Sequence, residues 1–378
     1  MYFQVFDKYK EFIDLLLDLK KDTRKEDISN EIQKYDLKSQ LFLIRDFSVK
    51  EDILKNNSNS TKDYNFEWKI NKKLGKNIHE LNLKIKSHFG SYQIKSFYII
   101  LSKEDRFILA IGYLSSKNLK RIEAFLESFF PKISNTFLTQ NEIKQMIFSL
   151  TRKKKYSLEY KMIIYSKKAL DGKIPRKAVD YILEDLKTKI LELENEHKFI
   201  DTIELLVSEI EENNIFRFRY NRLNKLIWYK GKADEVIKIL NNIYNIIIKK
   251  FDYLDKRERK DTSNNETKPF ILKFNESIFS TKDQISFFIN SFKNFPKCTY
   301  AVIHSGNPYL HLIMRDIKDN SSYTLKTVSH KDLMICPQII SSNSSLIRIL
   351  DFISNNIFEY KILDYDIYLD EIQSIKEN

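Results

Sequence analysis

Three stretches of the chain repeat one order of apolar patterns, and this order constrains the fold more than any single motif. Each stretch begins with alternating apolar residues typical of a strand, continues with a helical pattern, and ends with two more strands and an amphipathic helix. The stretches cover residues 64–130, 156–251 and 270–360. Only the order of elements recurs, because no residue-level identity links the copies. The pattern predicts a multi-domain α+β protein with three small antiparallel-sheet/helix modules.

Polar and charged segments mark the expected boundaries between these modules. Residues 55–63 are polar and rich in turn formers, and residues 255–267 are highly charged and then polar. We therefore expect four regions, which are an N-terminal helical segment at 1–60, a first α+β module at 61–150, a second module at 151–262 with a long helix and a basic surface, and a C-terminal α+β module at 263–378.

Several local patterns predict individual elements. Residues 94–101 and 106–114 are apolar runs around a short polar turn and predict a β-hairpin. Residues 76–89 fit a helix that Gly90 would close. Thr139 and Glu142 have the spacing of a capping box, in which each side chain satisfies a backbone amide at the start of a helix.

The longest helical pattern follows Pro175. We take Pro175 as its first residue, because proline is common at the first position of helices. Apolar residues then recur at alternating four- and three-residue steps, a spacing typical of a coiled coil or a long helical hairpin. We expect this long helical excursion to span about 175–212, with its seam over 179–210 and a break at the polar residues 194–198. The seam begins with Val179, Leu183, Leu186, Ile190 and Leu193.

The formal net charge of +12 suits a polyanionic partner such as nucleic acid or an anionic membrane surface. A second interpretation is coding bias toward A/T-rich codons, because Lys, Asn, Ile, Phe and Tyr are enriched together. Two cysteines are too few for a disulfide framework, which favours a reducing compartment. The sequence shows no leader peptide, and its longest apolar runs are too short to cross a bilayer. We expect a cytoplasmic protein without a membrane partner.

Two basic segments, residues 152–177 and the hairpin at 215–229 with the residue after it, contain the candidate nucleic-acid contacts. In the hairpin at 215–229, strand alternation places Phe216, Phe218 and Tyr220 on one side and the arginines on the other. Guanidinium groups beside aromatic rings suit a nucleic-acid strand, whereas aromatic core with solvated arginines is the simpler alternative. The predicted contact residues are Arg152, Lys153, Lys154, Lys155, Arg176, Lys177, Arg217, Arg219, Arg222, Lys225, Trp228 and Lys230.

His304 and His311 flank a short turn and are the candidate catalytic pair. Asp316, or His330 with Asp332, could complete a metal site there, although no spacing matches a known zinc pattern. The alternative is that the two histidines only sit beside a tight turn. The chain has no glycine-rich phosphate loop and no common hydrolase signature, so we predict no cofactor and no metal site.

The leading hypothesis is a non-catalytic nucleic-acid-binding subunit or adaptor of a larger intracellular complex, for DNA or RNA. One alternative is an assembly component that dimerises or holds a protein partner through the 179–210 helix. A second alternative is a divergent metal-dependent hydrolase or nuclease that uses His304 and His311.

Overall fold

The computed structural model describes fourteen stretches of the chain. These are residues 4–21, 35–55, 58–61, 63–75, 77–88, 90–102, 104–150, 156–167, 177–180, 184–196, 198–209, 215–258, 268–306 and 309–376. The chain divides into two compact units. The first contains Met1–Tyr165, Ala178–Leu193 and Ile200–Ile248, and the second contains Ser166–Lys177, Glu194–Phe199 and Lys249–Asn378.

Antiparallel strands and helices build both units, so the protein is of the α+β class. The elements up to the first sheet's last helix are η1 (Asp7–Tyr9), α1 (Lys10–Lys21), β1 (Leu37–Ile44), α3 (Ser48–Lys55), β2 (Ser58–Ser60), β3 (Tyr64–Lys73), β4 (Ile78–Ser87), β5 (Gly90–Ser102), β6 (Phe107–Tyr113), α4 (Ser116–Glu127), β7 (Ile133–Asn135), α5 (Gln140–Leu150), β8 (Tyr156–Lys167), β9 (Lys177–Asp180), β10 (Glu184–Asp185), α6 (Leu186–Asn195), β11 (Lys198–Glu209), β12 (Ile215–Asn221), β13 (Lys225–Lys230) and α7 (Ala233–Asp255).

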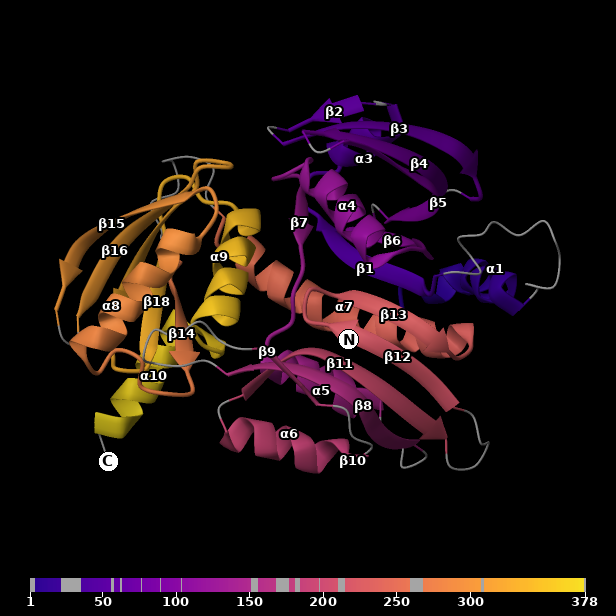
Figure 1. Ribbon diagram of the computed structural model, residues 1–378. Coiled ribbons are helices and arrows are strands. Elements are labelled where there is room, and N and C mark those ends of the chain that lie inside the picture. The colour runs from indigo at the N-terminus through magenta and orange to yellow at the C-terminus, as the bar shows by residue number, and fades with distance from the viewer. Residues whose placement is uncertain are drawn as a thin grey trace. The chain divides into compact units, whose positions relative to one another are not determined.

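One large sheet replaces the two separate sheets expected for residues 61–262. Its strand order is β10-β8-β11-β12-β13-β1-β6-β5-β4-β3-β2, with β7 on β1 and β9 on β8. One half of the sheet runs from β10 to β13 and the other from β6 to β2, and the two halves meet at β1 (Figure 1). There Leu37 lies opposite both Trp228 of β13 and Tyr113 of β6. The expectation of three small sheets is therefore wrong, because a strand in the region assigned to an N-terminal helical segment joins two of them.

The predicted helix at 76–89 is also wrong, since this segment is strand β4. His79, Leu81, Leu83 and Ile85 are buried at every second position, which is the period of a strand with one face in the core. The three apolar residues form one core with residues of β3, β5, β6, α3 and α4. The predicted hairpin of β5 and β6 and the capping box at the start of α5 are confirmed, with both arms of the box formed.

The predicted long helix and its coiled coil are wrong as well. Helix α6 contains only ten residues, and β11 occupies the second half of the seam. Leu186, Ile190 and Leu193 are buried on α6. In β11 the buried residues Ile203, Leu205 and Val207 follow the two-residue period, which overrides the helical spacing. Pro175 and Leu183 lie outside the described residues.

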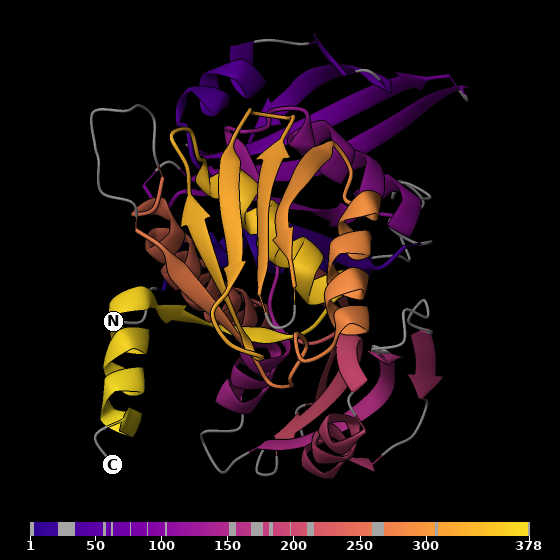
Figure 2. The same cartoon turned by 90° about the vertical axis from the view of Figure 1, so that its left-hand side faces the viewer.

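The C-terminal elements are β14 (Phe270–Phe274), α8 (Lys282–Ser291), η2 (Phe292–Asn294), β15 (Cys298–Ser305), β16 (Leu310–Asp316), β17 (Ser322–Thr327), β18 (Asp332–Pro337), α9 (Asn343–Asn356), β19 (Tyr360–Asp364) and α10 (Tyr365–Lys376). Their strands form a second antiparallel sheet in the order β15-β16-β17-β18-β14-β19 (Figure 2). The predicted hairpin of β15 and β16 is confirmed. Rings from α8, η2 and α9 form one core with the sheet, for example Phe292 with Phe352 and Tyr300.

The order of strand, helix, two strands and helix expected for each stretch is not repeated, since residues 64–130 contain four strands before their helix. Four-stranded meanders that are each followed by a helix do occur three times, with β9, β10 and α6 inserted between β8 and β11 of the second. The meanders are β3-β4-β5-β6, β8-β11-β12-β13 and β15-β16-β17-β18, and they are followed by α4, α7 and α9. The expected boundaries at residues 60, 150 and 262 remain predictions. Among the described helices, none is both long and apolar enough to cross a membrane.

His79 generates a first prediction. It lies in the core face of β4 with 2% of its surface exposed, and neither ring nitrogen has a hydrogen-bond partner in the part of the chain that the structure describes. Burial lowers the pKa of His79, and the charges of Lys50 and Lys73 lower it further. The unfolded chain therefore takes up this proton at a higher pH than the folded chain does. Stability contributed by the neutral ring is lost as pH falls from about 6.5 through the lowered pKa.

We expect His79→Leu to stabilise the protein by about 1 kcal/mol at pH 7, because it removes a buried polar group without a partner. The gain should be larger at pH 5. Urea unfolding at both pH values measures it, with His88→Leu, in the turn after β4, as the matched control. An equal change of stability with pH in the two variants would contradict the assignment.

Candidate functional site

Strand alternation sorts the β12–β13 hairpin into an apolar side and a charged side. Phe216, Phe218 and Tyr220 are buried, while Arg217 and Arg219 lie on the opposite face of the strand. Trp228 belongs to the apolar side, since it is only 3% exposed and its ring lies 5.4 Å from that of Phe218. The tryptophan predicted as a contact is therefore part of the core.

A single buried carboxylate holds both arginines. Glu204 of β11 lies opposite Arg219 in the ladder and is 2% exposed. Its Oε2 accepts from Nε of Arg219 at 3.1 Å and from Nη2 at 2.7 Å. Its Oε1 accepts from Nε of Arg217 at 2.6 Å and also from Nη2 of that residue. Both guanidinium groups are thus fixed side by side, each by its Nε and Nη2.

Tyr229 of β13 completes this arrangement. Its ring centroid lies 4.6 Å from the guanidinium carbon of Arg217 and 5.6 Å from that of Arg219, within the range of cation–π attraction. Burial raises the pKa of the Tyr229 hydroxyl. The ring is therefore neutral near pH 7. We call Glu204, Arg217, Arg219 and Tyr229 the arginine–tyrosine cluster.

Charged residues of β1, β13 and α4 extend the same face of the sheet. Lys225 Nζ lies 2.6 Å from Glu123 Oε2, and Gln40 donates to the other oxygen of Glu123 at 3.0 Å. Lys38, two residues before Gln40 in β1, donates to Ser116 Oγ at 3.2 Å. Burial lowers the pKa of Lys38, with a further lowering by Arg219 that Asp36 opposes. This face is polar and cationic, but most of its charged groups already have partners.

Of the remaining predicted contacts, the structure describes the side chains of Arg222 and Lys230. Arg222 is 3% exposed in the β12–β13 turn, and its Nη1 lies 4.0 Å from Asp201 Oδ1. Lys230 is exposed at the end of β13 and lies opposite Arg217 in the ladder, next to the cluster. Lys177 is a residue of β9 whose side chain is not described. Arg152, Lys153, Lys154, Lys155 and Arg176 lie outside the described residues.

His304 and His311 do come together, since they are directly opposite in the β15–β16 ladder. Lys326 lies opposite His311 on its other side, and burial, Lys326 and His304 together lower the pKa of His311. A cation beside two histidines opposes metal binding. Among the described residues, no group of three or more His, Cys, Asp or Glu side chains could hold a metal ion.

The acidic residues proposed for this site have other roles. Asp316 is fully buried and bonds Arg348 and Ser345 of α9, with Ser345 Oγ at 2.8 Å. Asp332 accepts from Ser329 and Tyr368. His330 lies with Nδ1 3.5 Å from the carbonyl oxygen of Phe279. In the described part of the chain, no hydrogen bond or ion pair joins these residues to His304 or His311.

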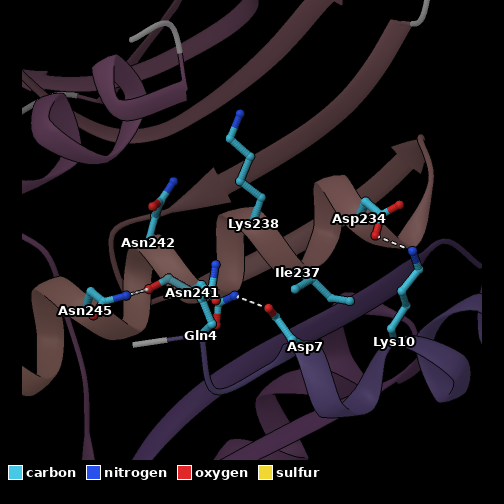
Figure 3. A pocket seen from close by; sticks show the side chains of 9 residues that line it. All are labelled: Gln4, Asp7, Lys10, Asp234, Ile237, Lys238, Asn241, Asn242 and Asn245. Atoms are coloured by element: carbon cyan, nitrogen blue, oxygen red, sulfur yellow. Dashed lines mark hydrogen bonds and ion pairs between the residues drawn. The ribbon is translucent and has the colours of Figure 1, made fainter. Parts of the chain in front are cut away.

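A pocket of about 410 Å³ lies between the N-terminal segment and α7 (Figure 3). Three of its charged groups have partners within the pocket: Lys10 and Asp234 pair at 2.6 Å, and Asp7 accepts from Asn241 at 2.8 Å. Asn241 also accepts from the amide of Phe6 at 3.0 Å. These contacts fasten the segment before α1 to α7, so we assign the pocket a structural role. Its lining residues are Gln4, Asp7, Lys10, Asp234, Ile237, Lys238, Asn241, Asn242 and Asn245.

Sequence reasoning missed Glu204, Glu123 and Lys38. The available signal for Glu204 was a single acid within the apolar run from Ile203 to Val207, close in the chain to the Arg-x-Arg of β12. No protein-family model matches the chain, and no curated protein matches it either.

Glu204 yields a second prediction. Glu204→Gln removes the buried negative charge and leaves two guanidinium groups without it, so we expect a loss of about 2 kcal/mol in the free energy of unfolding. The matched control is Glu123→Gln, because the side chain of Glu123 is 17% exposed against 3% for that of Glu204 and pairs with one cation, Lys225, so we expect a loss of about 1 kcal/mol or less. Urea unfolding at pH 7 measures both. Equal losses would mean that the shared carboxylate is no more important than an ordinary partly exposed ion pair.

Proposed function

We propose that this protein is a non-catalytic nucleic-acid-binding subunit or adaptor that contacts a single strand through the arginine–tyrosine cluster. One observation carries the proposal: Glu204 holds two guanidinium groups side by side next to the ring of Tyr229. Arginine side chains in fixed orientations can stack on bases and donate to phosphates.

The geometry leaves donors for such a partner. Each arginine uses Nε and Nη2 toward Glu204, and among the described residues the Nη1 groups of Arg217 and Arg219 have no hydrogen-bond partner. A third of each arginine side chain is exposed. Phosphate oxygens or base edges are acceptors that match these donors.

The charge of the surrounding face favours a polyanion. Lys38, Lys225 and the two arginines outnumber the carboxylates of Glu204, Glu123 and Asp36. An open sheet with Arg and Tyr side chains suits single-stranded nucleic acid better than a duplex, because a duplex does not expose the faces of its bases.

The other two hypotheses receive less support. The assembly hypothesis depended on a long helix, and this segment is a short helix and a strand. The hydrolase hypothesis needs acids near His304 and His311, whereas their described neighbour is Lys326.

We expect the protein to bind a labelled 20-nucleotide single strand of RNA or DNA. Binding should weaken several-fold when salt rises from about 50 to 200 mM, since a few phosphate contacts release counterions. Fluorescence anisotropy with single- and double-stranded probes tests this. Absence of binding at low salt would refute the proposal.

The residues are tested by the triple variant Arg217→Lys, Arg219→Lys and Tyr229→Leu. It keeps both positive charges opposite Glu204 but removes the planar groups, so we expect affinity to fall about tenfold. A control, Lys69→Glu with Lys72→Glu, reverses two exposed charges on β3. It should change affinity less than the triple variant does. A greater effect of the control would mean that net charge alone governs binding.

A further inference from the structure

Strand β15 is an edge of the C-terminal sheet. It pairs with β16 on one side, and no described strand pairs with it on the other (Figure 1). Six of its eight residues are exposed, and none is Pro, Lys, Asp or Glu, the residues with which edge strands commonly avoid further pairing. A bulge at Ile303 interrupts the register, so the regular part of the edge is Cys298–Val302.

The register shows which backbone groups of this strand point outward. The carbonyl oxygen of Lys297 accepts from the amide of Ile317 at 2.9 Å, which makes this a hydrogen-bonded pair. Hydrogen-bonded and non-hydrogen-bonded pairs alternate in an antiparallel ladder. Thr299 and Ala301 therefore bond toward β16, and the amide and carbonyl groups of Cys298, Tyr300 and Val302 point to the free edge.

The side chains around this edge are apolar and basic. Val302 is 41% exposed, Ile303 is 56% exposed, and Ile313 of β16 is 40% exposed. Lys297 and Arg315 are exposed near one end of the regular edge, with Arg315 opposite Thr299 in the ladder. At the outward positions of β15, β16 and β17 that the structure describes, there is no Asp or Glu.

We propose that β15 captures an extended acidic segment of a partner protein, which adds to the sheet as a seventh strand. The outward backbone groups supply the hydrogen bonds, and alternate side chains of the segment lie on either face of the sheet. Acidic side chains at one set of positions meet Lys297 and Arg315, and apolar ones at the other set meet Val302. A second copy of this chain fits less well, because β15 of that copy would bring its own cations to the same place.

The test uses fluorescein-labelled ten-residue peptides and the full-length chain at about 50 mM salt. The probes are (Glu-Val)5, (Lys-Val)5, and a (Glu-Val)5 derivative with a central proline that cannot pair as a strand. We expect (Glu-Val)5 to bind at least about tenfold more tightly than either of the others. Equal binding of the acidic peptide and its proline derivative would overturn the proposal.

Two variants locate the contact. Val302→Pro removes an amide from the free edge and leaves the bonds to β16, so we expect it to abolish binding with little change in thermal melting. Ile303→Glu places a like charge beside the acidic peptide and should weaken binding at least fivefold. Ile339→Glu is the matched control, because Ile339 is 54% exposed and lies outside the strands. Equal weakening by both glutamates would overturn the proposal, even if Val302→Pro fails to fold.

Two further outcomes would also overturn it. Concentration-dependent mass in sedimentation that Val302→Pro removes would show that the edge pairs with a second copy. Displacement of the peptide by single-stranded RNA in equal measure from the native chain and from Ile303→Glu would show that the peptide acts as a polyanion at the large sheet. The triple variant of the arginine–tyrosine cluster should retain peptide binding, which separates this inference from the proposed nucleic-acid contact.

Discussion

The pairing of β1 with both β6 and β13 is the constraint on which the first unit depends. All eight residues of β1 are buried, so its polar side chains need partners within the protein. Lys38 and Gln40 find them on α4, in Ser116 and Glu123. The same side chains thus position α4 over one half of the sheet and bring Glu123 to Lys225 in the other half. The charged face exists because this strand makes one sheet of two meanders.

How far the sequence predicts this fold depends on which period dominates each segment. The hairpins of β5 with β6 and of β15 with β16 have clear alternation around polar turns, and the structure confirms them. Residues 78–87 and 198–209 also alternate, but their apolar residues fit helical spacing as well. In the structure both segments are strands, so the two-residue period determines their conformation. Local pattern could not reveal β1, because a strand buried on both faces has no alternation to read.

The sequence likewise predicts only part of the candidate site. Alternation correctly separates Arg217 and Arg219 from the buried aromatic residues of β12. Alternation within one strand cannot predict the role of Glu204, since that carboxylate reaches the arginines only through the pairing of β11 with β12. Trp228 shows the opposite error: an aromatic residue among lysines looks accessible in the sequence, yet the β13 register turns it into the core.

The shared carboxylate has a consequence for the energetics of recognition. A free arginine side chain loses about 2 kcal/mol of rotamer entropy when it is immobilised. Glu204 and Tyr229 already confine both arginines in the folded protein, so most of this entropy is lost during folding and little remains to be lost on binding. The same carboxylate cancels one of the two positive charges. Long-range attraction is weaker as a result, while each contact that forms meets a side chain already held in place.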